Sequence, residues 1–283
     1  MPLSTMKDIL KCADDNGFAA AAFDVYNFES ANWVVKAAEE LNIPVILMFY
    51  PDMRNFIPLK IIGNICRMIA ESSSVPVGMH LDHSRSFELV VSGIPSGFQS
   101  IMFDGSARPF DENAGITKQV VESAGIFGVD VEAELGLVGM GSKKEDFLDT
   151  ELYTRSEDAK KFVEITGVDA LAVAIGNSHG HYVCEPHLDI ARLDEINRTI
   201  DTPLVLHGGS GIPREQMVES VKHGINKVNI GTEFFAKCRE SVGRNMSQGS
   251  GSVTNSLQDA GEEVMELVRD RLTLLNPNGF KLA

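Results

Sequence analysis

Short apolar segments alternate with longer amphipathic segments along most of the chain. The unit recurs at a spacing of roughly 25 to 40 residues, and such a unit predicts a strand followed by a helix. The predicted strands are residues 18–24, 44–50, 75–82, 98–104, 129–135, 170–175, 203–206 and 227–231. The predicted helices are residues 29–41, 58–71, 86–91, 111–124, 156–166, 190–199 and 213–223, with an eighth that begins near residue 233.

Eight strand–helix units with apolar strands predict an α/β protein with a closed parallel (β/α)8 TIM barrel. The rival is an open doubly wound sheet, which usually carries GxGxxG after its first strand. Here Asp24-Val-Tyr-Asn stands in that place, which favours the barrel. We expect a single domain over residues 1–283, with the barrel at about 6–244 and an additional C-terminal helix at about 257–275. Residues 245–255 read as a polar loop and the tail as only partly ordered.

The amino-acid composition excludes several classes of binding partner. The formal net charge of −15 argues against nucleic acid and against an anionic membrane surface. No apolar run approaches the roughly 20 residues that cross a bilayer. Four scattered cysteines indicate neither a disulfide framework nor a thiolate zinc site, and they are typical of a reducing compartment. We therefore expect a cytoplasmic protein whose metal, if any, is held by histidine and carboxylate.

Polar residues follow nearly every predicted strand. In (β/α)8 barrels the catalytic groups come from the C-terminal ends of several strands, so these residues should meet at one face. Polar chemistry at this many strand ends exceeds what a packed core needs. The residues are Asp24, Asp82, His83, Asp104, Glu134, Asn177, His179, His207 and Asn229.

Three of these strand-end residues are histidines, and they predict a metal site. Three imidazoles with an open fourth position are typical of catalytic zinc, and His83, His179 and His207 are the expected ligands. Zinc suits imidazole better than magnesium does. Asp104 and Glu134 would then support the ligands or offer the ion an alternative position.

Two further histidines compete for roles at this site. His181 lies two residues beyond His179 and could replace it as a ligand, although we favour His179. His80 shares a strand face with Asp82, so we expect it inside the barrel rather than on the metal.

Two glycine-rich turns precede the last two predicted barrel helices, at residues 208–211 and 229–232. Backbone amides at a helix start bind phosphate, and barrels usually bind it after strands seven and eight. A zinc ion, a phosphate site and the free carboxylate of Asp82 together favour reversible aldol cleavage of a phosphorylated ketose. A metal hydrolase would use the same ion to activate water, and the residues alone leave that alternative open.

Five motifs, in order along the chain, resemble those of the class II, zinc-dependent fructose-bisphosphate and tagatose-bisphosphate aldolases. The resemblance covers about residues 6–232. The motifs are His80-Leu-Asp-His83, Val131-Glu-Ala-Glu-Leu-Gly136, Ala172-Val-Ala-Ile-Gly-Asn-Ser-His-Gly180, Leu206-His-Gly-Gly-Ser-Gly211 and Lys227-Val-Asn-Ile-Gly-Thr232.

The resemblance implies Asp82 as the proton donor and one catalytic Zn²⁺ per subunit on His83, His179 and His207. It also implies a homodimer or homotetramer, a monovalent cation near the phosphate and a mobile loop at about residues 136–149. The implied products are dihydroxyacetone phosphate and an aldehyde, glyceraldehyde 3-phosphate for a fructose or tagatose bisphosphate. The residues implied to hold dihydroxyacetone phosphate are Gly180, Gly208, Gly209, Ser210, Asn229, Ile230, Gly231 and Thr232.

Departures from the family pattern concern the substrate more than the chemistry. Asp24 stands where the family commonly has Asn, and Met48-Phe-Tyr50 replaces a small polar segment. Arg85 lies just after the acid–histidine pair, and Arg54 follows the second strand. The candidates for specificity are Asp24, Met48, Tyr50, Arg54 and Arg85. They favour, as an alternative, a deoxy, acidic or sulfonated ketose phosphate as substrate. A non-catalytic partner subunit of an aldolase is a separate alternative, against which the intact Asp82 argues.

Overall fold

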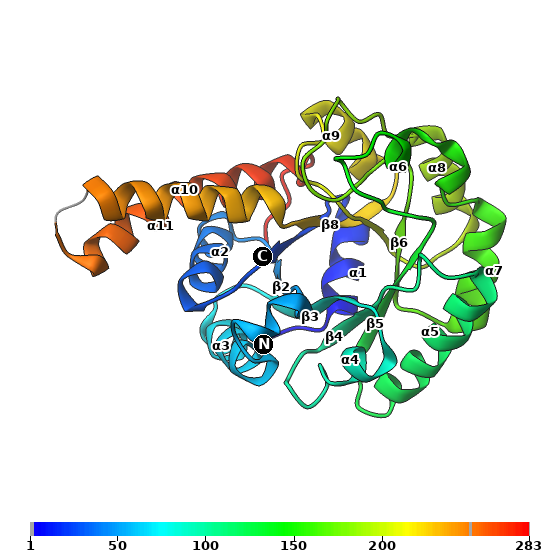
Figure 1. Ribbon diagram of the computed structural model, residues 1–283, viewed down its shortest axis with the longest axis horizontal. Coiled ribbons are helices and arrows are strands. Elements are labelled where there is room, and N and C mark those ends of the chain that lie inside the picture. The colour runs from blue at the N-terminus through cyan, green and yellow to red at the C-terminus, as the bar shows by residue number, and fades with distance from the viewer. Residues whose placement is uncertain (1–2, 249–250, 283) are drawn as a thin grey trace.

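The computed structural model describes residues 3–248 and 251–282, and a closed barrel of eight parallel strands lies at its centre (Figure 1). Each strand pairs with the next, and β8 pairs with β1, with Ala22 opposite Asn229. The predicted (β/α)8 barrel is confirmed. The strands are β1 (Ala20–Asp24), β2 (Val45–Phe49), β3 (Val77–Ser84), β4 (Ser100–Phe103), β5 (Asp130–Leu135), β6 (Ala170–Val173), β7 (Leu204–Leu206) and β8 (Ile225–Ile230).

Helices surround the barrel, and most begin and end within two residues of the predicted bounds. They are α1 (Met6–Asn16), α2 (Phe28–Leu41), α3 (Leu59–Ser72), α4 (Phe87–Val91), α5 (Phe110–Gly125), α6 (Glu145–Leu148), α7 (Ser156–Thr166), α8 (Ile190–Thr199), α9 (Arg214–Lys222), α10 (Thr232–Gln248) and α11 (Val253–Leu274). Two short 3-10 helices, η1 (Pro51–Asn55) and η2 (Thr150–Leu152), join them. Within the described ranges, no helix has the length and apolarity to span a membrane.

Helix α1 was not predicted, and it closes the N-terminal end of the barrel. Its apolar residues recur at helical spacing, so Met6, Ile9 and Leu10 share one face and are buried. The side chain of Thr5 accepts a hydrogen bond from the amide of Asp8 and caps the helix start. The apolar face packs against small and aliphatic side chains inside the barrel, which include Ala20, Ala22, Ile46, Met48, Ala170, Ala172 and Val205.

The barrel interior has an apolar half and a charged half. Side chains alternate across a strand, so Glu132 and Glu134 of β5 point inward while Val131 and Ala133 pack outward. Lys227 of β8 also lies fully buried at this level. The apolar half meets α1, and the charged half lies toward the C-terminal strand ends, where catalytic groups gather in this fold.

The C-terminal region differs from expectation. Helix α10 continues to Gln248 and α11 begins at Val253, so the predicted polar loop at 245–255 is largely helical; residues 249–250 lie outside the described part. The two helices pack together and extend beyond the barrel (Figure 1). The tail is also better packed than expected, because Phe280 stacks on Phe18 at 4.9 Å and Asn42 forms two hydrogen bonds to Leu282.

Candidate metal centre and active site

A β-bulge in β3 brings Asp82 and His83 into the same cavity. Neighbouring residues of a regular strand point to opposite faces, so Asp82 and His83 would otherwise diverge. The pairing of β3 with β4 shifts register between Leu81 and Ser84, and His83 adopts a φ of 24°, in the left-handed region that non-glycine residues rarely occupy. Bulges of this kind re-aim side chains next to active sites. The backbone strain therefore accompanies a functional placement of the imidazole.

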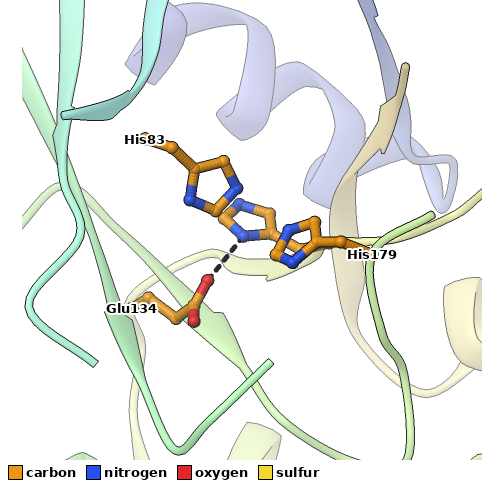
Figure 2. Close-up of side chains that lie close together, drawn as sticks. His83, Glu134 and His179 are labelled. Atoms are coloured by element: carbon orange, nitrogen blue, oxygen red, sulfur yellow. Dashed lines mark hydrogen bonds and ion pairs between the residues drawn. The ribbon is translucent and has the colours of Figure 1, made fainter. Parts of the chain in front are cut away.

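The three predicted ligands lie together. The ring centroid of His83 lies 4.6 Å from that of His179 and 4.6 Å from that of His207. One ligand atom from each of these residues and one from Glu134 all lie within 4.8 Å of one another. Figure 2 shows the His83 and His179 rings converging above the Glu134 carboxylate, whose dashed bond runs to the third imidazole. Side chains from β3, β5 and the segments after β6 and β7 thus form one cluster.

Hydrogen bonds fix the orientation of each ring. His83 donates from Nδ1 to Asp104 Oδ2 at 3.1 Å, and His179 donates from Nδ1 to the Val138 carbonyl at 3.2 Å. The Nε2 atoms of both rings therefore remain for the cluster, and that of His179 is buried without a partner. His207 differs, since its Nδ1 lies 2.7 Å from Glu134 and its Nε2 lies 2.9 Å from Glu132.

The pKa values of the three imidazoles shift in different directions. Burial and the neighbouring histidines lower the pKa of His179 to about 3, so this ring is neutral and ready to bind a cation. Burial would lower the pKa of His207 as well, but hydrogen bonds to Glu132 and Glu134 raise it to about 10. For His83, too, the pull of Asp82 and the bond to Asp104 outweigh burial and raise the pKa. A metal must therefore displace protons to bind here.

These residues fit a divalent metal ion. Imidazole nitrogens with one carboxylate are zinc-type donors, and a buried, unpartnered Nε2 on His179 is an atom that a ligand would satisfy. Of the two acids left open by the sequence, Glu134 belongs to the cluster, whereas Asp104 holds the far side of the His83 ring. His181 is exposed and outside the cluster.

Asp82 lies beside this cluster, in a second buried group of possible ligands with His80 and Glu132. Its Oδ1 accepts a hydrogen bond from Asn229 Nδ2 at 3.1 Å, and its Oδ2 is 3.9 Å from His83 Nε2. Burial would raise the pKa of Asp82, but the nearby imidazoles of His83, His207 and His80 outweigh it and lower the pKa. The carboxylate is therefore ionised, as a group that accepts a proton must be.

A pocket of about 270 Å³ opens beside Asp82 and the metal cluster. Most residues implied to hold phosphate line it, and α10 begins at Thr232 on its wall. Gly209 and Ile230 do not line the pocket, because the Gly209 amide donates to the Asn229 carbonyl and Ile230 packs in the outer core. The lining residues are Asp24, Tyr50, Asp82, His83, Arg85, Met140, His179, Gly180, Gly208, Ser210, Asn229, Gly231, Thr232 and Phe235.

Gly208 allows the two histidine-bearing loops to approach each other. It has a φ of 65°, and a Cβ at this position would lie 2.0 Å from the Ser178 carbonyl oxygen. Asn177 completes the link by donating to the His207 carbonyl at 3.1 Å. Close contact between these loops sets the separation of His179 and His207.

The candidate specificity residues separate into two groups. Asp24, Tyr50 and Arg85 line the pocket. Met48 is buried in the apolar half of the barrel, and Arg54 bonds to the Pro51 carbonyl on η1, so neither reaches the pocket wall.

Asp24 is the least ordinary of the pocket-lining candidates. Its side chain is 8% exposed and its Oδ1 has no hydrogen-bond partner. Burial and the charge of Asp82 raise its pKa well above the usual range. A Cβ on Gly231 would lie 2.4 Å from Asp24 Oδ2, so the absence of a side chain at position 231 makes room for this carboxyl group.

Sequence reasoning missed Glu132 and Lys227. Lys227 Nζ lies 2.8 Å from Glu132 Oε2, and both side chains are fully buried beneath the histidines. The signal was available, because Glu132 precedes Glu134 by two residues and Lys227 precedes Asn229 by two, which puts each on the inward face of its strand.

Comparison with known proteins gives consistent matches. The family model for fructose-bisphosphate aldolase class-II matches residues 4–279. The crystal structure of the YdjI aldolase from Escherichia coli K12 is 33% identical with a TM-score of 0.87, covering 96% of this chain and 97% of that one. A putative fructose-1,6-bisphosphate aldolase from Coccidioides immitis is 28% identical with a TM-score of 0.84, covering 96% of each chain. Fructose-bisphosphate aldolase from Campylobacter jejuni, 23% identical with a TM-score of 0.81 over 97% and 95% of the two chains, shares the fold.

Zinc binding should release at least about one proton per chain at neutral pH, because the proton between His207 and Glu134 must leave. Apparent zinc affinity should therefore rise about tenfold or more per pH unit from about pH 6 to 8, as measured by chelator competition. His207→Ala should lower zinc occupancy, and the control His181→Ala should leave it unchanged. Equal occupancy in wild type and His207→Ala would contradict the ligand set.

Proposed function

Because the chain belongs to the class II fructose-bisphosphate aldolase family, we propose that it is a zinc-dependent lyase acting on a ketose 1,6-bisphosphate of fructose or tagatose type. Its products would be dihydroxyacetone phosphate and glyceraldehyde 3-phosphate. The family uses a divalent metal and implies a phosphorylated sugar substrate. The observation that carries the proposal is the cluster of three imidazoles and Glu134 beside the ionised carboxylate of Asp82.

His83, His179 and His207 would hold the ion, with Glu134 as the alternative ligand. When bound, the ion would supply a Lewis acid that polarises the ketose oxygens and stabilises negative charge. Asp82 would accept the proton of the hydroxyl next to the breaking carbon–carbon bond, and return it in the condensation direction. Asn229 would hold the Asp82 carboxylate in place through its 3.1 Å hydrogen bond.

The phosphate end of the substrate would lie at the first turn of α10. Gly231 and Thr232 line the pocket where this 17-residue helix begins, and backbone amides at a helix N-terminus favour an anion. Ser210 joins the two glycine-rich turns, since its hydroxyl accepts a hydrogen bond from the Glu233 amide at 3.2 Å. A monovalent cation beside this phosphate stays part of the proposal, and comparing potassium with a bulky organic cation in the assay tests it.

The other end of the pocket favours an anionic aldehyde half. Arg85 lines this end with its side chain 71% exposed, where it can meet a second phosphate or another acid group. The same feature supports the alternative of a non-standard ketose 1-phosphate with a deoxy, acidic or sulfonated tail. A non-catalytic partner subunit is disfavoured, because such a subunit would have no need for an ionised Asp82 beside a complete ligand set.

The variant Asp82→Asn should lower kcat for carbon–carbon cleavage by about 10²- to 10⁴-fold, the usual contribution of a general acid–base. Zinc occupancy should stay at the wild-type level, because Asp82 is outside the ligand cluster. The exposed Asp111 supplies the control Asp111→Asn. Loss of zinc from Asp82→Asn would show that Asp82 is itself a ligand.

A coupled assay for dihydroxyacetone phosphate should detect chelator-sensitive release from fructose or tagatose bisphosphate. The panel should add a deoxy acid ketose phosphate and a sulfonated one. Arg85→Ala should raise KM for the bisphosphate about 2- to 5-fold, as expected for an exposed charge contact. Arg155→Ala is the matched control, since Arg155 does not line this pocket. Release of dihydroxyacetone phosphate only from the deoxy acid or sulfonated ketose would favour the alternative substrate. No release from any ketose tested would favour a non-catalytic partner subunit.

We further propose that the protein is a homodimer or homotetramer. Helices α10 and α11 extend beyond the barrel (Figure 1), and near their far end Met246 and Val253 expose 44% and 63% of their surface. Apolar side chains on a projecting element are typical of a surface that a partner covers. Light scattering should give a mass of two or four chains, and a single species at 30.8 kDa would contradict the proposal.

A further inference from the structure

A buried ion pair supports His207 from beneath the metal cluster. Lys227 Nζ lies 2.8 Å from Glu132 Oε2, and His207 Nε2 lies 2.9 Å from Glu132 Oε1. All three side chains are fully buried, so water does not compete for these contacts. Each oxygen of the Glu132 carboxylate thus has one fixed partner, an ammonium group on one side and an imidazole nitrogen on the other.

The direction of the second bond decides which His207 nitrogen faces the metal cluster. A carboxylate only accepts hydrogen bonds, so it requires a proton on Nε2. The opposite atom, Nδ1, faces Glu134, which shares a group with His83, His179 and His207, whereas Glu132 lies in a separate buried group with His80 and Asp82. Neutral imidazole carries one N–H, so a proton held on Nε2 leaves the lone pair on Nδ1.

We propose that Glu132 and Lys227 are positioning residues that hold the proton of His207 on Nε2 and so reserve Nδ1 for the divalent ion. The inference rests on the metal site of the proposed function and deepens it. Neither residue lines the substrate pocket, so both act through His207. Carboxylates that orient metal-bound histidines in this way typically change metal affinity by about 10- to 100-fold.

Lys227 is required because a lone carboxylate at this depth would be unstable. An unpaired buried charge is costly, and the group would take up a proton instead. A protonated Glu132 could donate to His207 rather than accept from it. The Lys227 ammonium group, 2.8 Å from Oε2 with both side chains fully buried, supplies the compensating positive charge at direct contact. Lys227 thereby keeps Glu132 an acceptor.

Two charge-balanced double variants isolate the acceptor. Glu132→Gln/Lys227→Met leaves an amide oxygen that can accept from His207 Nε2, whereas Glu132→Met/Lys227→Met leaves none. Both replace a buried ion pair by neutral side chains, a change that proteins often tolerate. We expect zinc affinity, measured by chelator competition on the full chain, to be about 10- to 100-fold weaker in the Met/Met variant than in the Gln/Met variant.

The single variant Glu132→Gln gives a second test. With Lys227 present, the amide oxygen should turn toward the ammonium group and present its NH₂ to His207, which moves the ring proton to Nδ1. Zinc affinity should therefore fall below that of Gln/Met, although Gln/Met carries one more substitution. Unfolding midpoints of the metal-free proteins separate this effect from a general loss of stability.

Equal zinc affinity in the two double variants would overturn the inference, as would wild-type affinity in Glu132→Gln. If Met/Met does not fold, the comparison of Glu132→Gln with Gln/Met decides; if Gln/Met does not fold, the comparison of Glu132→Gln with wild type decides. Wild-type protein that binds zinc but cleaves no ketose phosphate would end the proposed function, while the affinity order would still decide the inference. Wild-type protein that binds no divalent ion would overturn both.

Discussion

The site in this barrel depends on buried charged groups that compensate one another. Glu132, Lys227 and His207 are fully buried in a volume that most proteins fill with aliphatic side chains, and each would be costly alone. They are stable together because every carboxylate oxygen of Glu132 meets a donor, and His207 meets a second carboxylate, Glu134. The hydrogen bonds to Glu132 and Glu134 raise the pKa of His207 to about 10. In the metal-free protein the ring therefore carries a proton that a bound metal cation would displace.

Backbone geometry sets the remaining distances. The bulge at His83 turns two adjacent side chains into one cavity, and the close approach at Gly208 brings the loops of His179 and His207 together. These features depend on local conformations that are rare for the residues concerned, so the surrounding strands must enforce them. Helix α1 contributes from the other end, because it fills the apolar half of the barrel and keeps the charged layer free of solvent below.

The sequence sufficed for the barrel and for bringing the predicted ligands together, because both depend on strand order and strand ends. Period-two alternation and the acid–histidine endings placed Asp82, His83, His179 and His207 correctly at one face. The sequence did not reveal α1, because this helix precedes the first strand and is not part of the strand–helix repeat. Nor did it reveal the Glu132–Lys227 pair, since a partner 95 residues away depends on closure of the barrel. The sequence did not predict the β3 bulge, because the shift in register arises from how β3 pairs with β4.

The fold determines some parts of the pocket wall more strongly than others. The glycine-rich turns and the start of α10 contribute backbone and a helix N-terminus to the pocket wall, features that follow from the fold and favour an anion. The side chains of Tyr50 and Arg85, which follow β2 and β3, also line the pocket, and their identity can change without changing the barrel. Asp24 lies against the turn before α10, because a Cβ on Gly231 would lie 2.4 Å from its Oδ2, and burial together with the charge of Asp82 raises its pKa. Its Oδ1 is buried without a hydrogen-bond partner, so this part of the pocket wall carries a polar atom that a polar ligand would satisfy.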